Sequence, residues 1–218
     1  HYRVDMHGGS YKASRFDDAF INIQLADDSD NDDILDNKDI DNNNDGIVDA
    51  EFVNKNILDN AGFLKHQTDW QFNGLYPYNL QNRNGANDLM IATLNSNGSH
   101  YGYIEQTVSL KELGFTDTLA LDNALIDNVM KATFGGWNAG INTGSTAKIT
   151  LSFTNDNNET IGTPVVMSAA GTISYDWMNR EMSAVIPEST RFIHYRVDMH
   201  GGSYKASRFD DAFINIQL

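Results

Sequence analysis

The sequence predicts an all-β chain, in which an irregular acidic segment precedes an antiparallel β-sandwich. After Asn54, short runs of alternating apolar and polar residues are separated by turn-forming Asn and Gly pairs. Strands and helices do not alternate there, which is typical of antiparallel sandwiches. Before Asn54, residues 26–53 hold ten Asp and one Glu against one Lys, a net charge of −10 out of −15 for the whole chain.

The clearest predicted strand is residues 147–153, in which apolar odd-numbered residues alternate with polar even-numbered ones. Residues Ile193 to Met199 show the same period of two, so each strand should bury one face. Further strands are predicted at 88–94, 101–110, 127–137, 173–184, 191–200 and 212–218. Residues 118–130 are the one helical alternative. Trp137 and Trp177 lie in stretches typical of core strands, and burial is expected for both.

The acidic segment has a regular spacing. From Asp28 it reads DxDxDxxxDxxD, and from Asp41 it reads DxNxDGxxD. Alternate oxygen-bearing residues on a tightly curled loop can all face one hard cation, and Ca²⁺ takes six to eight oxygen ligands. The spacing therefore predicts Ca²⁺ as the cofactor, with these ligands: Asp28, Asp30, Asp32, Asp36, Asp39, Asp41, Asn43, Asp45 and Asp49. The alternative is a solvated acidic linker without bound metal.

Both runs depart from the EF-hand, whose twelfth-position Glu is replaced by Asp39 in the first run and by Phe52 in the second. The motifs DSDNDDILD and DNNNDGIVD instead resemble a pair of thrombospondin type-3 repeats, which are linear calcium-binding arrays. Asp33 stands where the first repeat would usually have Gly. This resemblance implies that residues 26–53 form an irregular calcium-binding linker.

The composition limits the cellular locations and the classes of partner that are expected. Calcium arrays of weak or moderate affinity need millimolar Ca²⁺, which favours an extracellular or cell-surface location. The pI near 4.5 argues against a nucleic-acid partner, and no window is apolar enough for membrane insertion. The absence of Cys excludes disulfides and thiolate metal sites.

Residues 1–25 recur letter for letter as residues 194–218. One interpretation is a tandem array, in which 1–25 are the tail strands of a preceding repeat, 26–53 the linker and 54–218 one sandwich domain. The other is an engineered duplication. In either case the two copies can compete for the same place in a sheet, so head-to-tail strand exchange with neighbouring repeats is expected at high concentration.

Several stretches after Asn54 resemble secreted carbohydrate-binding modules of the jelly-roll type with a galactose-binding-like fold. These are LDNAGF at 58–63 followed by Trp70, then TFGGW, ITLSFTNDNNETIG, IPESTRFIHYRVD and DDAFINIQL. Such domains often hold a structural Ca²⁺ beside the final strand, which implies Asp211 as a ligand, with Asp210 as its neighbour. Asn215 stands where the family often has an Asp in that strand, so this sequence departs from the family pattern for a second site.

A sugar-binding surface needs a flat aromatic face with polar groups beside it. Tyr76, Tyr78, Tyr101 and Tyr103 are the residues predicted for that role. No zinc-binding His spacing, nucleophile elbow or phosphate-binding loop is present, so an enzyme is not expected. The sequence therefore predicts a calcium-stiffened repeat unit of a bacterial adhesin or surface filament, acting as an extender between domains. The alternative is a lectin-like carbohydrate-binding module with a glycan partner.

Overall fold

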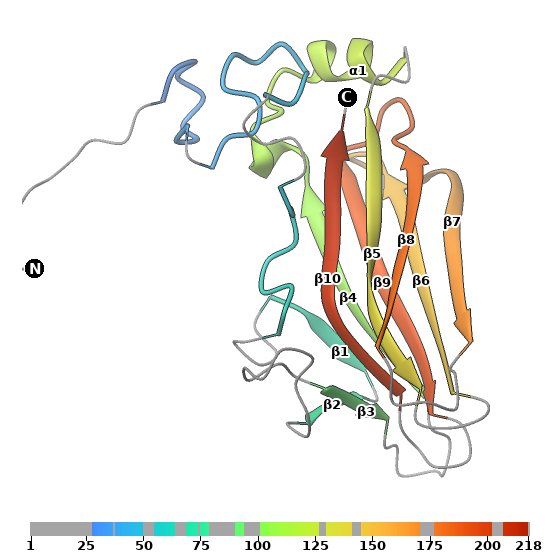
Figure 1. The fold of residues 1–218 in the computed structure, drawn as a ribbon. Helices are drawn as coiled ribbons and strands as arrows, with labels where there is room; N and C mark the ends of the chain where they lie inside the picture. The colour runs from blue at the N-terminus through green and yellow to red at the C-terminus, as the bar shows by residue number, and fades with distance from the viewer. Residues whose placement is uncertain are drawn as a thin grey trace, which may run out of the picture.

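The computed structural model describes residues 28–36, 38–49, 55–63, 69–73, 75–78, 90–93, 101–126, 130–140, 145–170, 177–201 and 207–217. Two antiparallel sheets face each other and form a β-sandwich (Figure 1). The predicted fold class, an antiparallel sandwich of the jelly-roll type, is confirmed. No helix among these residues is long and apolar enough to cross a membrane.

The larger sheet has five strands in the order β1, β4, β9, β6, β7. They span Gln71–Asn73, Tyr101–Ser109, Phe192–Gly201, Ser145–Thr154 and Thr160–Ala170. The second sheet orders β10 (Ser207–Gln217), β5 (Lys131–Gly140) and β8 (Met178–Val185). A separate pair joins β2 (Leu75–Tyr78) to β3 (Met90–Thr93). The 3-10 helix η1 (Lys111–Leu113) and the helix α1 (Thr118–Ile126) follow β4.

Most predicted elements occur near their predicted positions, although three strands were missed. The helical alternative at 118–130 is confirmed as α1, so β5 begins only at Lys131 rather than at Asp127. The strands β1 and β2 are short, and β7 contains Gly162 and Pro164, which weaken a strand pattern. Because β7 is the edge of the five-stranded sheet, a proline there need not remove a ladder hydrogen bond.

The core lies between the sheets, and the predicted alternation on β6 and β9 is confirmed. Ile149, Leu151, Ile193 and Val197 are fully buried. Tyr195 is also buried, and its hydroxyl donates a hydrogen bond to the carbonyl oxygen of Gly135 in the opposite sheet. The two sheets are therefore joined by a hydrogen bond through the middle of the apolar core.

The segment 58–63 and Trp70 close one side of this core. The Trp70 ring lies 5.1 Å from Phe63 and 5.9 Å from Tyr195, between ring centroids. Gln106 of β4 is buried, and its side-chain amide donates to the carbonyl oxygens of Asp59 and Asp69 at 3.0 and 2.9 Å. The residues that suggested a jelly-roll opening therefore pack against the core and are hydrogen-bonded to β4.

Two tryptophans differ from expectation. Trp137 and Trp177 are both half-buried rather than buried. Trp137 is aligned with Asp210 of β10 and Asn179 of β8, in the row of β5 that alternates with the buried Phe134. That row faces away from the core, so an apolar residue in it remains partly accessible.

Candidate functional site

The acidic segment packs against the η1–α1 region of the sandwich domain. Ile40 and Val48 are buried in the same hydrophobic cluster as the sheets. The Ile40 amide donates to the Leu113 carbonyl at 2.8 Å. Thr116 Oγ1 lies 3.0 Å from Asp32 Oδ2 and 2.7 Å from the Asn44 side-chain oxygen. The segment predicted as a linker is thus attached to the domain that follows it.

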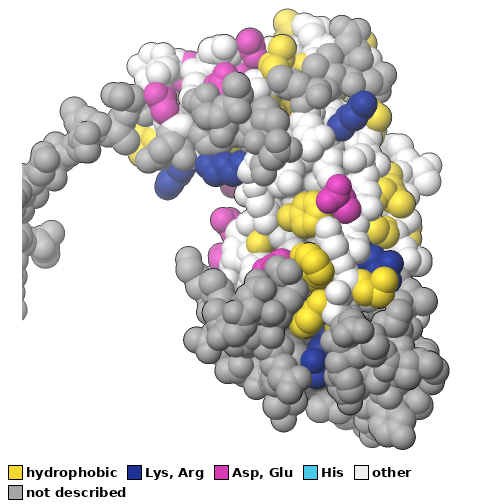
Figure 2. Space-filling view, viewed as in Figure 1, with side chains coloured by type: hydrophobic (Ala, Val, Ile, Leu, Met, Phe, Trp, Pro, Cys, Tyr) yellow, Lys and Arg dark blue, Asp and Glu magenta, His cyan; other side chains and the backbone are white. Residues whose placement is uncertain are grey.

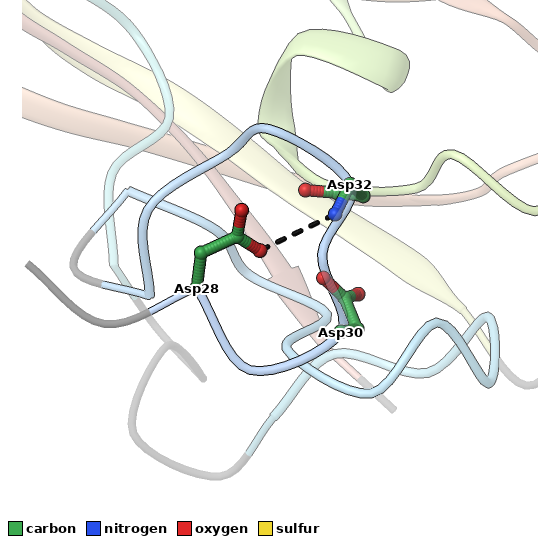
Figure 3. Close-up of side chains that lie close together, drawn as sticks. All are labelled: Asp28, Asp30 and Asp32. Atoms are coloured by element: carbon green, nitrogen blue, oxygen red, sulfur yellow. Dashed lines mark hydrogen bonds between the residues drawn. The ribbon is translucent and has the colours of Figure 1, made fainter.

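The first run brings three predicted ligands together. Asp28, Asp30 and Asp32 each offer a carboxylate oxygen, and these oxygens lie within 4.8 Å of one another (Figure 3). The Asp28 carboxylate accepts hydrogen bonds from the amides of Asp32 and Asp33, at 3.2 and 3.3 Å. These bonds curl the chain so that the three side chains come from one turn of the loop.

Asp39, the last acid of the first run, is a buried carboxylate. Its side chain is fully buried, and its Oδ1 accepts a hydrogen bond from the Asp41 amide at 2.8 Å. Within the described part of the chain, its Oδ2 has no hydrogen-bond partner. Burial raises the pKa of Asp39, and the neighbouring charges of Asp32, Asp30 and Asp36 raise it further. A buried, unpaired carboxylate oxygen needs a proton or a cation.

Both carboxylate oxygens of Asp30 are likewise inaccessible and have no hydrogen-bond donor in the described ranges. Burial and the charge of Asp32 raise the pKa of Asp30. Asp36, by contrast, accepts hydrogen bonds from the amide and the hydroxyl of Ser29, both at 2.8 Å. The donor set of the first run is entirely oxygen, with unused acceptor capacity on Asp30 and Asp39. It fits Ca²⁺ better than a softer metal.

The second run is organised around Asp41. Its two carboxylate oxygens accept hydrogen bonds from the amides of Asp45 and Gly46, at 3.1 and 2.9 Å. Burial raises the pKa of Asp41 to about 7. Asp49 accepts from the Asn42 amide at 2.9 Å, while Asn43 and Asp45 are exposed. Over the described residues, this run does not bring three carboxylates as close together as the first run does.

Asp211, the metal ligand suggested for the last strand, lies at an irregularity in β10. Its φ is 46°, and the register of β10 against β5 shifts between Asp210 and Phe213. The Asp211 amide donates to Asp210 Oδ1 at 2.8 Å, and Asn56 donates to the adjacent Ala212 carbonyl at 2.8 Å. Asp211 thus lies beside residues 55–61, which follow the acidic segment in the sequence.

A second group of interacting polar side chains lies on the outer face of the five-stranded sheet. The Tyr101 hydroxyl donates a hydrogen bond to Asp198. Arg196 contacts Asp198 Oδ1 at 2.8 Å and Glu105 at 3.1 Å, and Lys148 Nζ lies 3.3 Å from Asp198 Oδ2. We call these five residues of β4, β6 and β9 the sheet-face network: Tyr101, Glu105, Lys148, Arg196 and Asp198.

The side chains of this network shift one another's pKa values. Although burial opposes the shift, hydrogen bonds from Arg196 and Tyr101 hold the pKa of Asp198 below its usual range. The same contact with Asp198 raises the pKa of Tyr101. Asp198 is therefore a negative charge held between two cations and a hydroxyl, and the Tyr101 ring is fixed at its hydroxyl end.

The four predicted sugar-binding tyrosines differ in their surroundings. Tyr101 is 44% exposed. Tyr103 lies in the same outward row, but the Arg196 guanidinium is stacked on its ring, 3.5 Å from the centroid. Tyr76 and Tyr78 belong to β2, and their side chains lie outside the described residues. Of the two whose side chains the structure describes, Tyr101 thus offers the more open ring.

The alternation in the sequence predicts an outward polar row on β9, but it does not predict the sheet-face network. Arg196 and Asp198 alternate with buried residues, which predicts an outward face. Their contact with Glu105 and Lys148 depends on the strand order β4, β9, β6, which alternation within one strand does not reveal.

A groove of about 590 Å³ runs between the acidic segment and β4. Lys38 and Ile40 line it on one side, Lys55 and Leu58 on another, and Thr107 of β4 forms part of its floor. Thr107 lies in the same outward row as Tyr101, so the groove borders the sheet face.

No protein-family model matches the chain, and no curated protein matches it. Solved structures do match. The family 61 module TmCBM61, in complex with β-1,4-galactotriose, gives a TM-score of 0.50 at 16% identity, over 73% of this chain and 97% of that one. The active domain of tailspike protein 4 of bacteriophage CBA120 gives 0.52 at 8% identity, over 74% of this chain but only 21% of that one.

A family 22 module of Clostridium thermocellum Xyn10B gives a TM-score of 0.49 at 10% identity, over 78% of this chain and 97% of that one. At such low identities the likeness concerns the fold. The chain has the jelly-roll fold of carbohydrate-binding modules.

Proposed function

We propose that this chain is a carbohydrate-binding module of an extracellular protein and that its role is binding rather than catalysis. The observation that supports this most is the sheet-face network around the exposed Tyr101 ring. A sugar presents C–H groups that pack on an aromatic ring and hydroxyls that need charged or amide partners. Tyr101 offers the ring, while Glu105, Lys148 and Arg196 offer donors and acceptors beside it.

The matching solved structures support the same proposal. TmCBM61 was solved with a galactotriose, and the match covers 97% of its length and 73% of this chain. Our primary reading from sequence, a structural extender, gains no such support. The lectin-like alternative is therefore the better-supported function.

A glycan array followed by calorimetry tests this proposal. We expect a coherent class of oligosaccharides to bind, and Tyr101→Ala to weaken that binding about five- to thirtyfold, because a stacked aromatic contributes on the order of 1–2 kcal/mol. Val166→Ala is the matched control, since Val166 is also exposed but lies on β7 at the edge of the same sheet. An array without any bound glycan, in the presence of Ca²⁺, would contradict the proposal.

We further propose that the acidic segment binds Ca²⁺. Asp28, Asp30, Asp32 and Asp39 would hold the ion in the first run, with Asp36 beside them, and Asp41, Asn43, Asp45 and Asp49 would serve the second. The unpaired Asp39 oxygen is what favours a cation over a merely solvated acidic loop. Calorimetric titration of the metal-free chain with CaCl₂ tests this, and we expect binding with a rise in unfolding temperature.

A tandem array with an extender role is the second candidate function. The identity of residues 1–25 with residues 194–218 favours it. Its partners would be neighbouring repeats, joined either in sequence or by head-to-tail strand exchange. Light scattering over a range of concentrations distinguishes exchange, which gives growing oligomers, from a monomer at every concentration.

A further inference from the structure

The sequence before the acidic segment has a folded counterpart in the structure. Residues 1–25 repeat residues 194–218, and the latter include most of β9 and all of β10. Gln24 therefore corresponds to Gln217, the last residue of β10, and the acidic loop begins four residues later at Asp28. Where one unit follows another, the stretch from the end of β10 in the first unit to the acidic loop of the second therefore spans at most about 14 Å.

The acidic segment cannot serve as a long spacer in such an array. Ile40 and Val48 are buried in the hydrophobic core of its own domain, and Asp32 contacts Thr116. Gly46 packs so closely on α1 that an added β-carbon would lie 2.4 Å from the carbonyl carbon of Ala120. Two consecutive domains would then be separated by the short stretch 25–27 alone.

The end of the sandwich at which β10 finishes is well suited to contact another domain. Gln217 is aligned with Lys131 of β5, which is aligned with Val185 of β8. Figure 1 places the C-terminus beside α1, on which Leu119 and Ile126 are 70% and 52% exposed. Seven residues apart, these two lie on one helix face. We call Leu119, Ile126, Lys131 and Val185 the end surface.

Figure 2, viewed from the same side, shows hydrophobic, basic and acidic side chains exposed at this end of the molecule. The acidic segment also presents exposed apolar residues beside its charge. It carries a net charge of −10 around two partly exposed apolar residues, Leu35 and Ile47, each 37% exposed. Lys131 can face its carboxylates while the apolar residues of both surfaces lose contact with water.

We propose that the end surface of each unit is covered by the acidic segment of the following unit, so that consecutive units form a fixed pair. The partner is a second copy of this chain, and the short connection holds the two surfaces at high effective concentration. This inference rests on the tandem array proposed above and is independent of glycan binding by a single unit.

The experiment uses this chain extended after Leu218 by a second copy of residues 26–218. The sequence has no Cys, so Ser168→Cys in each unit, on exposed positions of β7, provides two specific spin-label sites. Pulsed electron paramagnetic resonance in the presence of Ca²⁺ then measures the distance between the two spin labels. We expect one narrow distribution.

Leu119→Glu with Ile126→Glu in the first unit should broaden that distribution about twofold, as a flexible connection allows. The same two substitutions in the second unit are the matched control, because no unit follows it, and they should leave the distances unchanged. A broad distribution in the unsubstituted protein would overturn the proposal. So would an equal response to the substitutions in either unit.

Discussion

Asp39 and Gly114 lie in direct contact: a β-carbon added to Gly114 would stand 1.7 Å from Asp39 Oδ1. Gly114 also ends η1 with a φ of 115°, in the left-handed region that favours glycine. The buried acid of the first run in the acidic segment thus packs on the turn that joins β4 to α1.

Gly114→Ala should therefore destabilise the protein by about 3 kcal/mol or more, through both the clash and the backbone strain. Gly162→Ala is the matched control, since its φ is also positive, at 67°, but its β-carbon would meet nothing closer than Pro187 at 3.4 Å. The control should cost about 1 kcal/mol. Denaturant unfolding in Ca²⁺ measures both, and equal losses would show that Asp39 does not pack there as described.

Asp39→Asn should have opposite effects with and without Ca²⁺. In EGTA the amide removes a buried, unpaired negative charge, so we expect the unfolding temperature to rise or stay the same. In Ca²⁺ the variant loses a charged ligand and should bind the ion at least about tenfold more weakly.

Asp33→Asn is the control for this substitution, because Asp33 is exposed and is not a predicted ligand. It removes the same charge from the same loop. Calorimetry and thermal unfolding with each buffer give the comparison. If both variants weakened Ca²⁺ binding equally, general electrostatics rather than coordination by Asp39 would explain the effect.

The fold could be predicted because alternation reports which residues of a strand are buried. Ile149 and Val197 were assigned to the core in this way, and both are fully buried. The sheet-face network could not be predicted, because the contact of Arg196 with Glu105 joins residues 91 positions apart in the sequence. Spacing likewise identified the acidic loop, but gave no signal that Ile40 and Val48 anchor it to the domain.

Arg191 and Asp122 form the contact that holds α1 to the start of β9. Both guanidinium Nη atoms donate to the carboxylate at 2.9 Å, and this pairing lowers the pKa of Asp122. Asp122→Asn should lower the free energy of unfolding by about 1–2 kcal/mol at neutral pH. Asp156→Asn is the control, because Asp156 is 74% exposed and 3.6 Å from Arg191 Nε.

The Asp156 variant should lose less than about 0.5 kcal/mol. Since the folded-state pKa of Asp122 is lowered, its contribution is present above the ordinary pKa of an Asp and is lost as the pH falls through the folded value. The difference between wild type and Asp122→Asn should therefore shrink in acid. A difference that did not change with pH would contradict the ion pair.

His194 should give the folded protein a pH dependence nearer neutrality. Its ring nitrogens lie 2.9 Å from Thr107 Oγ1 and 2.8 Å from Thr154 Oγ1, and burial lowers its pKa. The unfolded chain takes up a proton near pH 6.5, where the folded protein still resists it. The free energy of unfolding that His194 contributes is therefore full above about pH 6.5 and declines as the pH falls.

The test is to compare wild type with His194→Gln by denaturant unfolding between pH 7.5 and 5.5, a window set around the ordinary histidine pKa of about 6.5. The advantage of the wild type should fall by no more than about 1.4 kcal/mol per pH unit, the limit for one proton. Because the comparison is a difference, the titration of Asp41 in the acidic segment cancels. His200→Gln, on an exposed position of the same strand, serves as the control. An advantage that stayed constant across this range would mean that His194 is as easily protonated in the folded protein as in the unfolded chain.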